Sequence, residues 1–200
     1  MKLEIFQSKK KDKELISQCI EIDKTCYEEK YRGTEAIYHS WFEKNNNIFT
    51  FAIDYDTNNV VGYMITLSLT NKAYLEMKAG NTIDLSLDSE CILPFIKGRR
   101  NFIYVASIAV RDEYQGQGIS SKIMEYSNRF LDKLKDNGII IEKVLGDAVN
   151  EKMLKSCINR EFKEKIKSNH NSTIVEKHHK RNYYDKNKKN VDKQLWNKIE

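Results

Sequence analysis

The feature that most constrains how this chain can fold is a strand, a glycine turn and a helix in direct succession within residues 101–134. The apolar, β-branched run from Phe102 to Val110 is short for a helix and predicts a buried strand. After a polar turn, the segment Gln115-Gly-Gln-Gly-Ile-Ser120 opens a helix, which ends where Gly138 offers a left-handed cap. The apolar stripe of this helix consists of Ile119, Ile123, Tyr126, Phe130 and Leu134.

A glycine turn that leads into the N-terminus of a helix is typical of an anion-binding site. Its backbone N–H groups have no partner within the helix and lie at the positive end of the helix dipole. Glycine also lets a phosphate approach the main chain closely. Neither the G-x-G-x-x-G motif of dinucleotide-binding folds nor the Gly-Lys-Ser/Thr motif of P-loops is present.

The same segment resembles motif A of the GCN5-related N-acetyltransferases, in which Q/R-x-x-G-x-G/A follows a strand that ends in I-A-V. Gln115 and Gly118 match this motif, and Gly116 is common there. Ser120 departs from the usual Gly or Ala, but it is small enough for a close approach. The resemblance implies a single-domain α/β fold with a mixed, mostly antiparallel central sheet flanked by helices.

A second segment, residues 150–162, is similar to motif B of the same family. Asn150, which can cap a helix, and Phe162, which opens the next strand, match at the right separation. Cys157 stands where the family often has Tyr, and Glu161 where it has Gly. The resemblance covers roughly residues 1–178 and is strongest over residues 101–134.

The remaining residue patterns predict the other elements of a mixed sheet. Ser8 or Asp12 could cap a helix that runs to about Tyr27, and Thr34 is expected to cap a second helix through Lys44. Asn150 is expected to cap a later helix over residues 151–160. Apolar runs predict further strands over residues 3–7, 48–54, 60–68, 139–148, 162–167 and 172–177.

Residues 71–100 are expected to form an insertion before the central strand, folded partly as a hairpin that includes the alternating segment Thr82–Leu87. Loops of this length are usually functional or mobile. Because the insertion contains Asp84, Asp88 and Glu90, it could shape an acceptor pocket. A surface decoration without a function is an equally good interpretation.

Length and composition fit one α/β domain over residues 1–178 followed by a basic tail over 179–200. The chain has 200 residues, of which 40% are hydrophobic and 32% charged, and no apolar run approaches the 18 residues that suggest a membrane span. Its first residues do not resemble a signal peptide. The four cysteines have no metal-ligand spacing, so reduced thiols, a cytoplasmic location and no bound metal are expected.

The resemblance implies an acetyl-CoA-dependent N-acetyltransferase, in which a primary amine attacks the thioester directly and no covalent enzyme intermediate forms. The acceptor would be a small-molecule or peptide amine, and the protein a monomer or homodimer without membrane association. The pyrophosphate would rest on the N–H groups of Gly116, Gln117, Gly118, Ile119 and Ser120. The pantetheine arm would pair with the backbone of Ser107, Ile108, Ala109 and Val110, with Gln115 and Asn150 in the same cofactor site. A main-chain N–H near Ile108 would polarise the thioester carbonyl.

The general base and the general acid are not evident from the sequence. Many relatives carry a glutamate on the central strand, in Y-I-E-S-I-A-V, but this chain has Ala106 at that position. An ammonium acceptor must still lose a proton, and the candidate bases are Glu28, Glu29, Tyr104 and Glu90. Cys157 is a possible general acid for the departing thiolate, although the tendency of cysteine to be buried favours a packing role.

Two other classes of function remain open. Ala106 and Cys157 are compatible with a catalytically weak module that only binds acetyl-CoA. Residues 163–200 hold 11 Lys and Arg against 5 Asp and Glu, so the basic tail could associate with nucleic acid, although a solvated terminus is the more common outcome. Binding of that kind would weaken steeply with salt.

Overall fold

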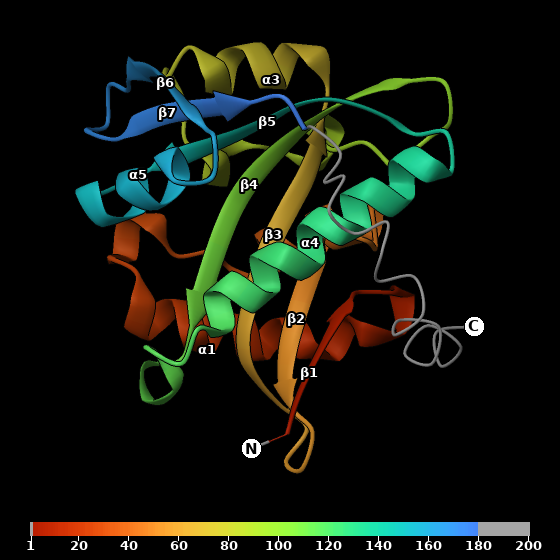
Figure 1. The fold of residues 1–200 in the computed structure, drawn as a ribbon, viewed down its shortest axis with the longest axis vertical. Coiled ribbons are helices and arrows are strands. Elements are labelled where there is room, and N and C mark those ends of the chain that lie inside the picture. Colours follow the sequence, from red (N-terminus) through yellow and green to blue (C-terminus); the bar gives the residue numbers. More distant parts are fainter. Residues whose placement is uncertain (1, 180–200) are drawn as a thin grey trace.

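A computed structural model describes residues 2–179 of the chain as a mixed α/β unit built on a seven-stranded sheet (Figure 1). The strands are β1 (Leu3–Gln7), β2 (Phe49–Asp54), β3 (Asn59–Leu69), β4 (Arg100–Val110), β5 (Ile140–Ala148), β6 (Lys163–Lys167) and β7 (Thr173–Lys177). The helices are α1 (Ile16–Cys26), α2 (Glu35–Lys44), α3 (Asn71–Lys78), α4 (Ile119–Asp136) and α5 (Glu151–Ile158). From residue 180 onward, the predicted basic tail lies outside the described residues.

The strands follow the order β1-β2-β3-β4-β5-β7-β6, and every neighbouring pair except β4 and β5 is antiparallel. The predicted fold class, a mostly antiparallel sheet flanked by helices, is therefore confirmed. The central strand and the hairpin of β2 and β3 also lie where the apolar runs predict them.

The parallel pair β4 and β5 separates halfway along the central strand. Their pairing ends at Val105 and Gly146, while β4 continues to Val110 against β3 alone. A bulge lies at the same point, because Ile65 pairs with Ser107 and the next residue, Thr66, pairs with Val105, which leaves Ala106 as an extra residue in β4. The last residues of β4 therefore keep an edge that β5 does not cover.

Helices cover both faces of the sheet (Figure 1). Helix α4 crosses one face, and α1 packs against β3 and β4 on the other. The buried residues of α4 are Ile119, Ile123, Ser127 and Leu131. The predicted stripe is thus correct at its start and shifted farther on, since Tyr126, Phe130 and Leu134 lie only partly buried at its flank. Ser127 faces Thr66 on the sheet, with 3.4 Å between the hydroxyl oxygens.

Local capping signals decide where several helices begin. Thr34 accepts a hydrogen bond from the Ile37 N–H at the start of α2, as predicted. Ser8 does not cap the first helix, because its hydroxyl donates to the Asn46 carbonyl and accepts from the Phe49 N–H, tying β1 to β2. Asp12 instead accepts from the Lys9 N–H in a 3-10 turn that precedes α1.

The hairpin prediction for residues 71–100 is wrong. Thr70 caps the helix α3, and the segments Asp84–Ser86 and Ser89–Cys91 are 3-10 turns. The alternation in Thr82–Leu87 does not indicate a strand here, because Leu85 and Leu87 pack against the core and the Leu87 carbonyl accepts a hydrogen bond from the Trp41 indole. Tertiary packing overrides the local pattern. Within residues 2–179, no helix is long and apolar enough to cross a membrane.

Candidate active site

A cleft of about 600 Å³ opens where β4 and β5 separate. Its wall includes the uncovered end of β4, the glycine turn, the first half of α4, the end of β5 and one side of α5. On the far side of β4, the cleft is closed by the loop after α1 and by residues 83–85 of the insertion. The cleft is therefore one passage with two ends, which lie on different sides of the central strand.

The glycine turn forms the first end of the cleft. Gly116 and Gly118 have left-handed backbones with φ of 76° and 75°, and a Cβ at either position would meet nothing within 4 Å. Gly118 begins α4, and no side chain caps the helix there. The side-chain amide of Gln115 braces the turn by donating to the Val110 carbonyl and to Asp112. This turn fits a phosphate group, because Gly116 and Gly118 line the cleft with free space beside them, at the N-terminus of an 18-residue helix.

Basic side chains from α5 and beyond add positive charge at this end. Lys152, Arg160 and Lys177 line the cleft. One guanidinium nitrogen of Arg160 lies 3.3 Å from the hydroxyl of Ser121, on the first turn of α4, and another binds Ser156 at 2.7 Å. Sequence reasoning missed Arg160, because an arginine at the end of a basic helix carries no signal that separates it from its neighbours.

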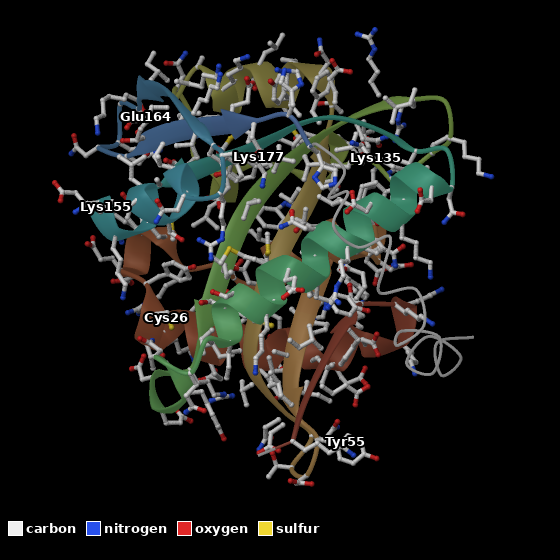
Figure 2. The ribbon with its side chains drawn as sticks, viewed as in Figure 1. Cys26, Tyr55, Lys135, Lys155, Glu164 and Lys177 are labelled. Carbon is white, nitrogen blue, oxygen red and sulfur yellow. The ribbon has the colours of Figure 1, made fainter. Side chains whose placement is uncertain are left out.

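The uncovered edge of β4 is contacted by two side chains that follow one another at the end of α1. The Tyr27 hydroxyl donates to the Ile108 carbonyl at 2.7 Å and accepts from the Ile108 N–H at 3.2 Å. The Cys26 thiol, labelled beside the start of α4 in Figure 2, donates to the Val110 carbonyl at 3.3 Å. A pantetheine arm that paired with Ser107–Val110 would replace these contacts.

Tyr27 also belongs to a buried hydrogen-bonded network. Ser107 lies 3.2 Å from Tyr27 and 3.1 Å from the hydroxyl of Tyr63. Tyr63 reaches the carboxyl group of Asp23, which also accepts from Tyr38 at 2.7 Å. Burial raises the pKa of Tyr27 well above that of a free tyrosine, so its hydroxyl stays protonated beside the thioester position suggested by the sequence. Sequence reasoning placed Tyr27 only at the end of a helix.

The candidate bases are spread over three environments. Tyr104 is buried and lines the cleft, and burial, followed by the charges of Asp84 and Asp147, raises the pKa of its hydroxyl. Glu28 lines the cleft but is exposed and paired with Lys30. Glu29, in the exposed 3-10 turn that follows, does not line it.

Glu90 lies away from the cleft altogether. Its side chain is 80% exposed and forms an ion pair with Lys44 of α2. The reason is the local fold, because the 3-10 turn Ser89–Cys91 packs beside α2 and not beside β4.

Residues of motif B line the cleft from α5. Asn150 caps α5 by accepting a hydrogen bond from the Met153 N–H at 2.8 Å, and its side chain faces the cleft. Cys157 is partly buried in the same wall. Burial raises the pKa of the Cys157 thiol, against the opposing charges of Arg160 and Lys177, so the thiol is protonated at neutral pH.

The second end of the cleft contains acidic side chains. Asp84 comes from the insertion and Asp147 from the end of β5. Asp147 Oδ2 lies 2.9 Å from Nε2 of His170, in the turn between β6 and β7. Sequence reasoning placed Asp84 in an insertion that could shape an acceptor pocket, but it missed Asp147 and His170, because only the sheet brings them together. Across residues 2–179, no group of three or more His, Cys, Asp or Glu side chains is arranged to hold a metal ion.

The sequence profile of the acetyltransferase (GNAT) family matches residues 16–155, which is more than half of the chain. The chain belongs to the acetyltransferase (GNAT) family. The match includes the glycine turn, the whole of α4 and the first half of α5. Membership of the GNAT family supports acyl transfer from acetyl-CoA in general, and the predicted family is confirmed.

Solved structures share the GNAT fold at low sequence identity. The loading GNATL domain of CurA from Lyngbya majuscula has a TM-score of 0.64 and 13% identity, covering 90% of this chain and 98% of that one. Arabidopsis thaliana Naa50 in complex with the bisubstrate analogue CoA-Ac-MVNAL has a TM-score of 0.55 and 12% identity, covering 88% and 99%. The GphF GNAT-like decarboxylase in complex with isobutyryl-CoA has a TM-score of 0.62 and 11% identity, covering 88% and 100%. No curated protein matches the sequence significantly.

Proposed function

We propose that this GNAT-family chain is an acetyl-CoA-dependent N-acetyltransferase that moves an acetyl group to a primary amine by direct attack. The observation that carries the proposal is the single cleft that joins the glycine turn to an acidic pocket across the edge of β4. An anionic donor suits one end and a cationic acceptor suits the other, so the two substrates would meet at the separation of β4 and β5.

The donor half of the reaction follows from main-chain groups. The pyrophosphate would bind the N–H groups of residues 116–120, with Arg160 as a nearby counter-charge. The pantetheine arm would lie along Ser107–Val110, where β5 leaves the edge uncovered. The Ile108 N–H, or the Tyr27 hydroxyl that it now contacts, would then donate to the thioester oxygen as negative charge develops there.

The transfer itself needs no covalent enzyme intermediate. The nitrogen lone pair of the neutral amine forms a bond to the thioester carbon, and the C–S bond breaks as the carbonyl re-forms. The departing CoA thiolate takes a proton, which the amine nitrogen must lose to become an amide. Because a thiol has an ordinary pKa near ~8.5, a strong general acid is not required for this departure.

Two measurements, made one after the other, test the proposal. Acetyl-CoA at about a hundred times its dissociation constant should raise the free energy of unfolding by about 2.7 kcal/mol, and thermal unfolding detects this. An acetyl-transfer screen over alkyl amines, polyamines, amino acids and peptides should then reveal acceptor-dependent thiol release, with the acetylated product identified by mass spectrometry. Peptides belong in the screen because Naa50, of the same fold, is known in complex with a CoA-peptide bisubstrate analogue.

Each negative outcome has a distinct meaning. Stabilisation by acetyl-CoA without transfer to any acceptor would favour a module that only binds acetyl-CoA. Thiol release that does not depend on an acceptor would indicate hydrolysis or another reaction of the thioester. A folded protein whose unfolding is unmoved by millimolar acetyl-CoA would contradict the proposal at its first step.

A further inference from the structure

The acidic end of the cleft is assembled from segments that are distant in sequence. Asp84 belongs to the 3-10 turn Asp84–Ser86 of the insertion, and Asp147 lies near the end of β5, where its Cα pairs with Ile174 of β7. The insertion is held against the β6–β7 turn by hydrogen bonds from Asn169 to the carbonyls of Gly80 and Asn81. Asp84 and Asp147 thereby face the same cleft.

The hydrogen-bond partners of these carboxylates are incomplete. The Asp147 side chain is only 10% exposed. Its Oδ2 contacts His170, whereas its Oδ1 is buried and has no hydrogen-bond partner. Asp84 Oδ1 accepts a hydrogen bond from the Leu85 N–H at 2.9 Å. Within residues 2–179, no Lys or Arg forms an ion pair with either carboxylate. Leaving a buried acceptor without a donor is unfavourable, so the unpartnered oxygen of Asp147 suits a site whose missing donor is a ligand.

Another buried carboxylate in the same sheet is fully neutralised. Glu176 of β7 is 4% exposed and lies 2.8 Å from Lys78, 3.3 Å from Lys165 and 3.6 Å from Lys143. Burial alone would raise the pKa of Glu176, but hydrogen bonds from Lys78 and Tyr74 and the charges of Lys78 and Lys143 lower it to about 2. Lysines thus surround the buried carboxylate that lies away from the cleft, whereas the basic neighbour of the two carboxylates that line it is a histidine, His170.

We propose that Asp84 and Asp147 bind the protonated amine of the acceptor and that Asp84 removes its proton before acetyl transfer, an inference that rests on the proposed function. An alkylammonium group brings three N–H donors and one positive charge. Asp147 Oδ1 and the Asp84 carboxylate supply acceptors, while His170 positions Asp147 through Oδ2.

The proton balance of the step is simple. The ammonium RNH3+ gives one proton to the ionised Asp84 carboxylate, which leaves RNH2 and a neutral carboxylic acid. The amine then forms the C–N bond, the C–S bond breaks, and the CoA thiolate takes the second proton as the amide forms. Asp84 returns its proton to water after the products leave, so the net products are RNHCOCH3, CoASH and one proton.

The electrostatic environment suits Asp84 to this role. Burial, helped by the charge of Asp147, raises the pKa of Asp84 to about 7, against the opposing effects of the Leu85 N–H and the charge of His170. Asp84 retains some exposed surface as a residue, which lets its proton reach solvent. A base whose pKa lies near the working pH is ionised often enough to accept a proton and weak enough to release it.

The same charges restrict the class of acceptor. A second carboxylate next to the amine, as in a free α-amino acid, would meet two like charges in a poorly solvated pocket. Tyr27, Tyr31 and Tyr104 line the cleft and provide aromatic surface around the amine. The expected acceptor is therefore a primary alkylammonium group on a chain without an adjacent carboxylate.

The test compares two similar acceptors of different charge. Benzylamine is cationic at neutral pH, whereas O-benzylhydroxylamine is neutral there and needs no deprotonation. With the full chain and acetyl-CoA, Asp84→Asn should lower kcat/KM for benzylamine by about 10²–10⁴-fold and that for O-benzylhydroxylamine by less than about tenfold. The matched control is Glu90→Gln, in the same insertion but outside the cleft, which should leave both values unchanged.

A binding measurement runs independently of turnover. Benzylammonium chloride should bind the protein more tightly than benzyl alcohol, as followed by NMR titration. Asp147→Asn and Asp84→Asn should each remove that preference, while Glu90→Gln keeps it. Both asparagine variants are isosteric with the natural residues, and their thermal unfolding verifies that they are folded.

The outcomes separate this inference from the proposed function. If the natural chain acetylates amines but Asp84→Asn acts equally well on both acceptors, the assignment of Asp84 is overturned and N-acetyl transfer stands. Equal binding of benzylammonium and benzyl alcohol by the natural chain would overturn the ammonium site. If no amine is acetylated, the proposed function and the proton-transfer step fail together, and the binding preference alone decides the site.

Discussion

The two ends of the cleft are built from different parts of the polypeptide. At the glycine turn, the groups that face the cleft are main-chain N–H groups of consecutive residues, together with the dipole of α4. At the acidic end, they are side chains from the insertion, from β5 and from the β6–β7 turn. The first end is determined by local backbone geometry, and the second exists only after the sheet has formed.

The two ends also differ in the charge that they can accept. The N-terminus of α4 and Arg160 present positive charge to an anion, whereas Asp84 and Asp147 present negative charge to a cation. Oppositely charged substrates would therefore be directed to opposite ends of one passage. Substitutions at the first end should matter when they change the backbone, and those at the second end when they change a charged atom.

The largest expected effect tests whether the first end works through its backbone. Gly118→Val should weaken binding of CoA by about a hundredfold, because a β-branched side chain would stand where the phosphate approaches a residue with φ of 75°. Gly98→Val is a matched control, since Gly98 also has φ of 75°, has equally free surroundings and lies outside the cleft. Calorimetric titration with CoA measures both. If both variants lost the same affinity for CoA, backbone strain alone would explain the effect.

A smaller effect is expected on the free energy of unfolding, which the ionised Asp84 carboxylate at the acidic end should lower. The pKa of Asp84 in the folded protein, about 7, lies above its unfolded value, so the folded state holds more protons between pH ~4 and ~7. The free energy of unfolding must then fall as pH rises through this window. Asp84→Asn removes that loss and should be more stable than the natural chain at pH 8, with no difference left near pH 4. The full rise of the pKa, from about 4 to about 7, corresponds to about 4 kcal/mol, and we expect about 2 kcal/mol because Asp84 is only partly buried and solvent screens its charge.

Chemical denaturation of both chains across this pH range checks the prediction. The charged and titratable side chains around Asp84 include Asp147, His170 and Tyr104, and all three are present in both chains. Glu90→Gln should change stability by less than about 0.5 kcal/mol at any pH. An Asp84→Asn variant that is less stable at pH 8 would show that the Asp84 carboxylate is well solvated and that the two ends are more alike than proposed.

The smallest effect is expected for Cys157→Ala, which tests whether a side chain at the first end takes part in the chemistry. Cys157→Ala should lower the free energy of unfolding by about 1 kcal/mol from lost packing and leave the rate per folded molecule unchanged. Turnover and unfolding measured on the same preparation decide between packing and proton donation. A variant that is equally stable but a hundredfold slower would make Cys157 the general acid and would break the contrast between the two ends.

Features that depend on a few consecutive residues could be predicted from the sequence. The glycine turn, the caps at Thr34 and Asn150 and the central strand all lie where the residue patterns place them. Each of these follows from backbone conformation and local hydrogen bonding, which neighbouring residues determine. The fold class could be predicted as well, through the resemblance of two segments to motifs of a family with a mixed sheet.

Features that depend on contacts between distant segments could not be predicted. The alternation of Thr82–Leu87 suggested a hairpin, but packing of Leu87 against α2 produces 3-10 turns and brings Asp84 to the cleft. The contact of Tyr27 with Ile108 joins residues 81 positions apart, and that of Asp147 with His170 joins residues 23 positions apart.

The sequence by itself therefore determined the fold class and the glycine turn to which we assign the donor, because consecutive residues build that turn. Only the tertiary structure decided which side chains face the other end of the cleft, because burial and the neighbouring charges arise when separate segments pack together. A carboxylate such as Asp147 is one of 29 acidic residues in the sequence, and only packing leaves one of its oxygens buried without a partner.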